Sequence, residues 1–190
     1  MRRFSVKILA FLAVGVALNY VGANIALFLR LPVYLDSIGT IFCAFLLGPL
    51  YGMLTGLASG LLSGITTDLF SLYYIPVAMC TGLAAGWVYS RFHRVFQVPL
   101  QALVIMIPGT ILSSLITYFL FGGITSSGSS IIVQMIYGLG LSKFTSVILV
   151  QIVTDYCDRL LAVIVATLVL TALPKRLKQV FNQQAFIHKS

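Results

Sequence analysis

Long apolar runs, interrupted by short polar or Gly/Pro-containing segments, dominate this chain. The runs at 105–121 and 147–173 contain few ionisable residues. A helix needs about 20 apolar residues to cross the hydrocarbon core of a bilayer, and fewer when neighbouring helices shield it. Cutting the chain at its polar and Gly/Pro positions predicts six spans, at 7–29, 36–50, 52–67, 74–91, 99–121 and 144–173.

The second and third of these spans are short and are joined by the sequence Gly-Pro-Leu-Tyr-Gly at 48–52. They could therefore form one kinked passage, which would give five spans in all. The basic residues near the two ends decide against this reading; they are Arg2, Arg3, Lys7, Lys175, Arg176, Lys178 and Lys189. Because positive charge is retained on the cytoplasmic side, both ends are expected inside, and an even number of crossings follows.

The loops give a second check on this topology. The loop with Arg91, His93 and Arg94 falls inside after four crossings. The remaining loops, 30–36, 68–73 and 122–143, then fall outside and carry Arg30, Asp36, Asp68 and Lys143. The expected fold is an all-α integral membrane protein, a compact bundle of about six transmembrane helices with both termini in the cytoplasm.

Composition agrees with a membrane protein. Of 190 residues, 59% are hydrophobic and 8% are charged, with a mean hydropathy of +1.05, whereas a soluble domain is about 25% charged. We therefore expect a single transmembrane domain over residues 1–190. The net charge of +8 lies at the ends and in one loop, which indicates membrane orientation and gives no reason to expect a nucleic-acid partner. The three cysteines (Cys43, Cys80, Cys157) lie in apolar segments and are expected to be small buried residues.

Small residues recur at helical spacing in three spans. Glycines occupy every fourth position from 48 to 64, and Ala78, Gly82 and Gly86 repeat this spacing in the fourth span. Such faces let helix backbones approach closely, so we expect tight packing between these helices. Ala13 and Ala17 form an Ala-x-x-x-Ala face on the first span, which suits either internal packing or docking of another membrane subunit.

Ionisable residues inside the last span are the strongest candidates for a site. Gln151, Asp155, Asp158 and Arg159 fall at i, i+4, i+7 and i+8, on one face of a helix. Arg159 lies one turn beyond Asp155 and can pair with it. This face is either a buried ion pair that fixes helix register or the floor of a solute cavity that opens outward. One arginine cannot neutralise both carboxylates, so a protonated acid, a lysine such as Lys143 or a ligand group is expected to help.

The outer loops supply further candidates. Asp36 stands at the mouth of the second span, and Asp68 lies with Tyr73 and Tyr74 in the next outer loop. The Gly- and Ser-rich segment at 122–130 is typical of either a ligand loop or a solvated linker, and 131–141 is apolar enough to fold back over the protein as a short helix. Asn19 and Asn24 are expected to hydrogen-bond between helices. The candidate substrate-binding residues are Asn24, Asp36, Asp68, Tyr74, Ser126, Ser127, Ser129, Gln151, Asp155 and Arg159.

Motifs of catalysis are absent from the sequence. It contains no Gly-x-x-x-x-Gly-Lys-Ser/Thr loop for ATP, no His-Glu-x-x-His, no Gly-x-Ser-x-Gly and no convincing metal cluster. We therefore expect no enzyme activity and no metal or other cofactor. A polar cavity in a small bundle is better suited to capturing a solute.

Taken together, six short spans, the Ala13-x-x-x-Ala17 face and the ligand-type outer loops resemble the substrate-binding S components of energy-coupling factor (ECF) transporters, over roughly residues 5–175. The resemblance implies that Ala13 and Ala17 dock on a coupling transmembrane subunit carried by two ABC-type ATPases. It also implies capture of a vitamin or related micronutrient at the outer face of a bacterial plasma membrane. Asp36, Asp68, 126–130, Asp155 and Arg159 occupy regions where that family binds its ligand.

The resemblance leaves the substrate open among pantothenate, cobalamin, riboflavin and nucleoside-like solutes. In this family the loaded bundle is expected to topple in the membrane when ATP drives the coupling subunit. Two other functions fit the residues: a non-transporting membrane sensor or assembly subunit, and a small proton-coupled secondary transporter in which Asp155 or Asp158 titrates. The absence of a visible inverted repeat argues against the latter.

Overall fold

The computed structural model describes residues 6–92 and 97–173, and within these ranges the chain is helical and contains no strand. The helices are α1 (Val6–Phe28), α2 (Ile38–Leu47), α3 (Pro49–Thr66), α4 (Phe70–Tyr73), α5 (Ile75–Arg91), α6 (Val98–Phe119), α7 (Ser129–Gly138) and α8 (Lys143–Ala172). His93 and Arg94, as well as the basic residues Arg2, Arg3, Lys175, Arg176, Lys178 and Lys189, lie outside the described residues.

Six of these helices, α1, α2, α3, α5, α6 and α8, fall on the six predicted spans, with ends that differ by a few residues. By length and composition, α1 and α6 are the described helices able to cross a bilayer. Helix α2 has 10 residues and α5 has 17, fewer than the usual 20 or so, and α8 carries three ionisable residues at its centre. That all six cross the membrane stays a prediction.

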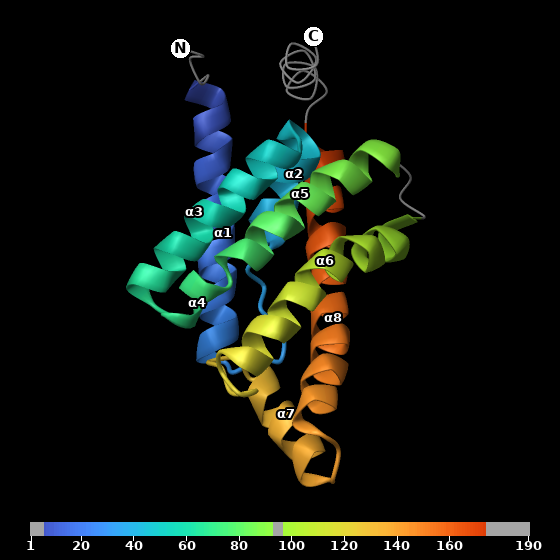
Figure 1. Cartoon of the computed structure of the whole chain (residues 1–190). Helices are drawn as coiled ribbons and strands as arrows, with labels where there is room; N and C mark the ends of the chain where they lie inside the picture. Colours follow the sequence, from blue (N-terminus) through green and yellow to red (C-terminus); the bar gives the residue numbers. More distant parts are fainter. Residues whose placement is uncertain (1–5, 93–96, 174–190) are drawn as a thin grey trace.

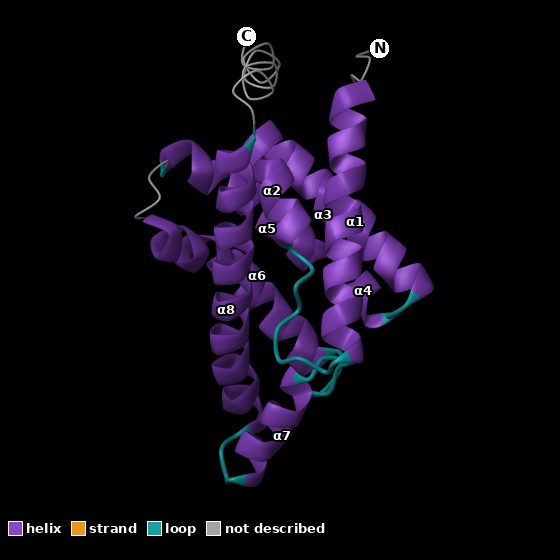
Figure 2. Ribbon diagram, turned by 180° about the vertical axis from the view of Figure 1, so that it is seen from behind, coloured by secondary structure: helices purple, strands orange, loops and turns teal. Residues whose placement is uncertain are grey.

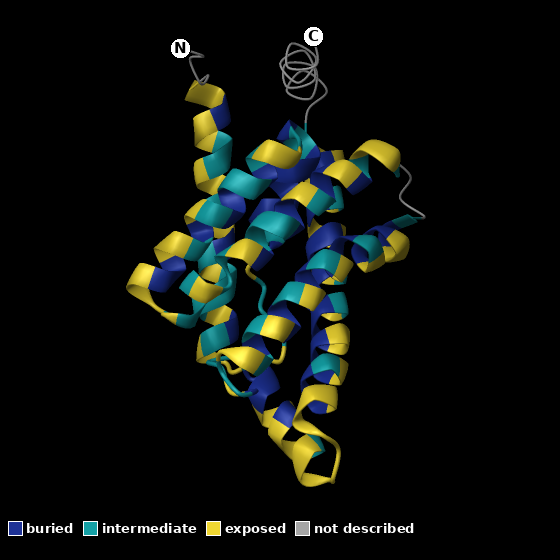
Figure 3. Cartoon of the chain, viewed as in Figure 1, coloured by how far each residue is buried: buried dark blue, intermediate teal, exposed yellow. Residues whose placement is uncertain are grey.

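The outward face of α6 is apolar, and the inward face of its second half is polar. Leu103, Ile107 and Ile111 are exposed on this helix, whereas Thr110 and Ser113 are buried. Figure 3 shows the same division of exposed and buried stripes along α1 and α8. A water-soluble helix has the opposite pattern, and apolar side chains outside with hydrogen-bonded hydroxyls inside are what a lipid environment favours.

Helix α2 lies at the centre of the bundle and packs against α1, α3, α5 and α8 (Figure 1). It is apolar except for Thr40, and residues 39–45 are all buried, as expected of a helix with neighbours all round. Ten residues span about 15 Å. The loop at 29–37 supplies the rest of this passage, and it rises into the interior beside α1 (Figure 2).

The chain breaks between α2 and α3 at Gly48 and Pro49. Gly48 has φ of 104°, in the left-handed region that favours glycine, and Pro49 begins α3, where a missing N–H costs nothing. In Figure 1, α2 approaches the end of the molecule where α1 begins, and α3 runs back from it. The two segments are therefore separate helices and not one kinked helix.

The small-residue faces pack α3 directly against α5, as the sequence predicts. A Cβ on Gly56 would lie 2.6 Å from the Ala78 carbonyl oxygen, and Gly52 and Gly82 face each other at backbone distance. Gly86 faces Pro49 in the same way. The expectation that the cysteines are small buried residues is confirmed for Cys43. It is wrong for Cys157, which is exposed on α8.

We expect Gly56→Ala to lower the free energy of unfolding by about 1–3 kcal/mol, because the added methyl overpacks the α3–α5 contact. This loss outweighs the gain in helix propensity of about 1 kcal/mol. The matched control is Gly138→Ala in α7, where a Cβ meets no atom within 4 Å. Unfolding in mixed micelles of rising dodecyl sulfate content measures both variants, and an equal effect at the two positions would contradict the packing described.

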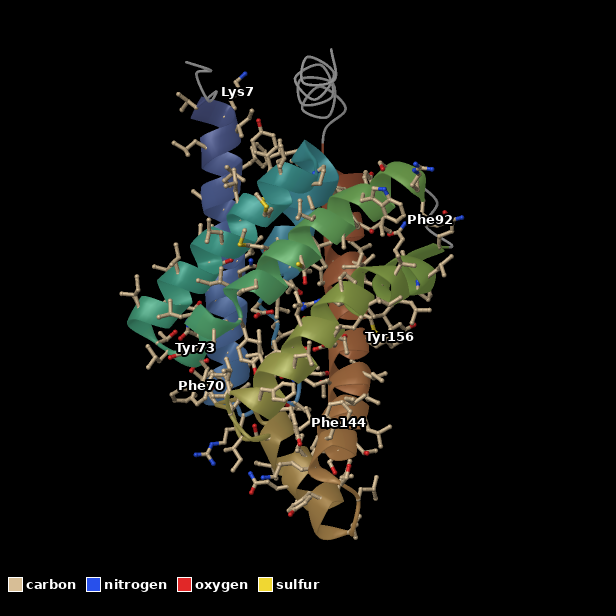
Figure 4. All side chains as sticks on the ribbon, in the orientation of Figure 1. Lys7, Phe70, Tyr73, Phe92, Phe144 and Tyr156 are labelled. Carbon is tan, nitrogen blue, oxygen red and sulfur yellow. The ribbon has the colours of Figure 1, made fainter. Side chains whose placement is uncertain are left out.

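The two ends of the bundle differ in what they carry. Helix α1 begins and α8 ends at one end (Figure 1), and Lys7 and Phe92 lie toward this end in Figure 4, away from Phe70 and Tyr73. The opposite end carries the connections 29–37, 67–74 and 120–128. This arrangement agrees with an even number of crossings.

The segment predicted to fold back over the protein is helical, but its position differs from the expectation. Helix α7 packs along the first turns of α8 and extends the molecule beyond the loops (Figure 1). Val133 of α7 is buried against Val147 and Val150 of α8. This apolar contact holds α7 against α8 and not across the bundle.

Candidate functional site

A cavity of about 110 Å³ lies beneath the connections 29–37, 67–74 and 120–128. This volume is several times what one water molecule requires. Side chains from α1, α2, α3, α5, α6 and α8 reach it, so the whole bundle contributes to its walls. Hydroxyl, amide, carboxylate and aromatic groups line it, among them Asn19, Tyr34, Asp36, Asp68, Tyr74, Ser113, Asp155 and Arg159.

The polar face of α8 anchors the loop at 29–37. Asp158 is 0% exposed and accepts hydrogen bonds from the Leu35 backbone N–H (2.6 Å) and the Ser37 hydroxyl (3.0 Å). Arg159 Nη1 lies 2.6 Å from Asp158 Oδ2 and 3.8 Å from Asp36 Oδ1. One buried carboxylate therefore holds both the loop and the arginine.

The predicted pair of Asp155 and Arg159 is wrong. The guanidinium turns to Asp158, the residue next to it in sequence, and to Asp36, which the loop brings to it. Lys143 does not reach this cluster either, because it is exposed at the start of α8, where its Nζ lies 5.6 Å from the centre of the Tyr137 ring.

Asp155 faces α6 and does not pair with the arginine. Its Oδ2 accepts hydrogen bonds from the Thr110 hydroxyl (2.8 Å) and the Ser113 hydroxyl (3.2 Å). The residue is 3% exposed and lines the cavity. Asp155 of α8 and Ser113 of α6 thus line the cavity from facing helices, and Thr110 holds the carboxylate from α6.

The loop at 29–37 enters the bundle because glycines leave room for its backbone. Gly22 of α1 faces the Leu35 carbonyl directly, so any side chain at Gly22 would displace the loop. Arg30 and Leu35 have φ of 50° and 53°, in the left-handed region that non-glycine residues rarely adopt. Hydrogen bonding of Leu35 to Asp158 offsets the cost of this conformation.

The serine-rich connection covers the cavity at the end of the bundle that carries the loops. Ser126 donates a hydrogen bond to Asp68 Oδ2 at 2.8 Å, and the Tyr34 and Ser129 hydroxyls lie 3.2 Å apart. Gly128 packs against the Arg30 carbonyl with no room for a side chain.

The structure brings seven of the ten candidate residues to this cavity: Asp36, Asp68, Tyr74, Ser126, Ser127, Asp155 and Arg159. The other three do not line it. Asn24 donates to the Tyr20 carbonyl of its own helix, Gln151 is buried with its amide on Thr117, and Ser129 bonds Tyr34 and Ser127 behind the loop. The expected interhelical bond of Asn24 is therefore wrong.

Asn19 is a cavity residue that was expected only to tie helices together. It donates to Thr40 (2.8 Å) and Ser59 (3.0 Å) and accepts from the Gly39 N–H (2.7 Å), so its interhelical role is confirmed. Tyr34 and Ser113 were not singled out for the site. The signal for Tyr34 was its position two residues before Asp36, in the same loop.

A family model described as "ECF transporter, substrate-specific component" matches residues 7–170 of the chain. No curated protein and no solved structure matches the chain. The match covers all the helices that line the cavity.

Proposed function

Because the chain belongs to the family of substrate-specific components of ECF transporters, we propose that it captures a vitamin or related micronutrient in the cavity under its loops and delivers it into the cell. Members of this family are transport subunits and not enzymes, and the chain resembles them in the residues discussed above. Its task is then selection of the solute, and the energy for uptake comes from partner subunits.

The observation that carries this proposal is the polar cavity closed by three connections. Asp36, Asp68 and Asp155 reach it from three different parts of the chain. Asp155 is buried, and buried ionisable groups are costly in a membrane bundle and are usually kept for a ligand or ion path. A convergent polar lining beneath closable loops is the arrangement expected of a solute-binding site.

We place the chain in a bacterial plasma membrane, with six crossings and both termini in the cytoplasm. The apolar outward faces of α1 and α6 support this position. The end of the bundle that carries the loops is then the outer one, and the cavity opens to the side from which a solute arrives.

The proposed partners are a coupling transmembrane subunit and two ABC-type ATPases, together with membrane lipid. Ala13 and Ala17 are exposed on α1 and are not used in packing the bundle. A face of small residues lets another helix approach closely. ATP-driven movement of the coupling subunit would then rotate the loaded bundle as a rigid body and open the cavity inward.

A second candidate function is proton-coupled secondary transport, which the position of Asp155 favours. Its carboxylate is buried in a membrane bundle and pairs with hydroxyls, with no basic side chain among the described residues within ion-pair distance. Such carboxylates act as proton carriers in transporters. A non-transporting sensor is less well supported, because it needs no cavity.

Proteoliposomes separate the two transport mechanisms. The chain is reconstituted with an ECF module, supplied with a mixture of micronutrients, and the accumulated solutes are identified by mass spectrometry. We expect accumulation that requires ATP on the cytoplasmic side and is unchanged by a proton ionophore. Accumulation by the chain alone that the ionophore abolishes would overturn the proposal in favour of proton coupling.

A further inference from the structure

The cavity lining carries an excess of negative charge. Three carboxylates, Asp36, Asp68 and Asp155, line it against one guanidinium, that of Arg159. No lysine or histidine is among the described lining residues. The charges that belong to the cavity itself therefore sum to minus two when its carboxylates are ionised.

The charge of Arg159 is balanced largely by an acid outside the lining, although its buried Nε has no hydrogen-bond partner among the described residues. Its Nη1 is held by Asp158 at 2.6 Å and also lies 3.8 Å from Asp36. Asp158 is fully buried and does not line the cavity. The guanidinium is thus already paired with an acid outside the lining, and the ionised lining is left more negative than the sum suggests.

Asp155 has one oxygen that the protein does not use. Both of its hydroxyl donors, Thr110 and Ser113, bond Oδ2. Oδ1 accepts no hydrogen bond from the described part of the chain, and it is not among the polar atoms sealed from the cavity. An ionised carboxylate that is 3% exposed and has no cation beside it is costly, and either a proton or a bound cationic group removes that cost.

Aromatic rings complete the lining near these acids. Tyr34, Phe70 and Tyr74 line the same cavity. Ring faces attract organic cations by their quadrupole, and this attraction strengthens when water is excluded. Carboxylates and aromatic rings together are the usual protein partners of quaternary or protonated nitrogen.

We propose that the solute captured here is a small organic cation, with its positive nitrogen placed at Asp155. This inference rests on the proposed capture function and narrows the class of solute. Asp155 Oδ1 faces the nitrogen, Asp36 adds long-range attraction, and the aromatic rings pack against the carbon skeleton.

The test compares cations with neutral molecules of the same shape. The purified full chain in detergent is melted with choline or with dimethylbutanol, in which carbon replaces the nitrogen, and with benzylamine, benzyl alcohol or benzoate. We expect choline and benzylamine to raise the melting temperature by several degrees in a saturable manner. The neutral isosteres and benzoate are expected to leave it unchanged.

Variants at Asp155 assign the effect to this site. Asp155→Asn is expected to raise the half-maximal cation concentration at least about tenfold, which corresponds to about 1.4 kcal/mol. Asp155→Glu restores the charge and is expected to restore most of the response. Cys157→Ser, on the exposed side of the same helix, is the control and keeps the response of the unmodified chain.

The outcomes separate this inference from the proposed function. Equal stabilisation by the isosteres, a stronger effect of benzoate, or an unchanged response in Asp155→Asn overturns the cation assignment and leaves solute capture standing. If a neutral or anionic molecule co-purifies with the chain and no cation raises the melting temperature, the cation assignment is likewise overturned and solute capture stands. If no probe stabilises the chain and nothing co-purifies with it, both proposals fail.

Discussion

Asp158→Ala is expected to lower the free energy of unfolding by about 3–5 kcal/mol, since it leaves a buried guanidinium without its partner. Asp158 is fully buried and bonds Arg159, the Leu35 N–H and the Ser37 hydroxyl. Its loss removes the charge partner and both anchors of the loop at once. Unfolding in mixed micelles of rising dodecyl sulfate content measures the change.

The double variant Asp158→Ala, Arg159→Met is the control for this prediction. It removes the buried positive charge together with its partner, so we expect a smaller loss of stability than in Asp158→Ala alone. The loss of stability in Asp158→Asn should lie between those of Asp158→Ala and the double variant, because an amide oxygen can still accept a hydrogen bond from the Leu35 N–H. A loss below about 1 kcal/mol for Asp158→Ala, the size of one ordinary hydrogen bond, would contradict the role assigned to this residue.

The second large effect is expected on transport and not on stability. Replacing Ala13 and Ala17 together by tryptophan should reduce ATP-driven uptake at least about tenfold, because two indole rings prevent the close helix contact that small residues permit. A tenfold reduction corresponds to about 1.4 kcal/mol of docking free energy. Both alanines are exposed, so the bundle itself should fold and hold its solute normally. Uptake in proteoliposomes and solute capture by the chain alone are measured side by side.

A matched pair on α6 controls for the added bulk. Ile111 and Leu115 have the same spacing as Ala13 and Ala17 and are also exposed on the membrane surface. Tryptophan at both of these positions should leave uptake close to that of the unmodified chain, since these side chains lie on α6 and not on the proposed docking face of α1. Full uptake by the variant with tryptophan at Ala13 and Ala17 would contradict the proposed docking role of these two residues.

The sequence was informative wherever local chemistry decides the structure. Apolar length and Gly/Pro punctuation placed α1, α2, α3, α5, α6 and α8, and Gly48 with Pro49 marks the break between α2 and α3. The small-residue spacing of α3 and α5 predicted their close contact, because a helical period of about four residues places such residues on one face. The family resemblance is confirmed by the match over residues 7–170.

The partner of Arg159 could not be predicted from spacing on one helix. The i, i+4 rule favours Asp155, but Asp36 arrives from a loop more than 100 residues away in sequence. Pairing with Asp158 then satisfies the arginine and the loop backbone together. A contact between residues so distant in sequence cannot be predicted from the spacing of residues within one helix.

Helix α7 and Gln151 show a second limit of the pattern. The apolar composition of α7 predicted a helix but not its direction, which depends on the valine contacts with α8. Gln151 shares a helix face with Asp155, yet its amide turns to Thr117 and lies behind the cavity. A shared face does not settle which of its side chains meet an open space.

Native mass spectrometry of the purified chain, expressed alone in rich medium, tests most directly whether the cavity captures a solute. The account predicts a discrete adduct with the mass of a small organic molecule, lost in variants that alter the cavity acids. A spectrum of the unliganded chain alone, unchanged after a mixture of micronutrients is added, would contradict solute capture.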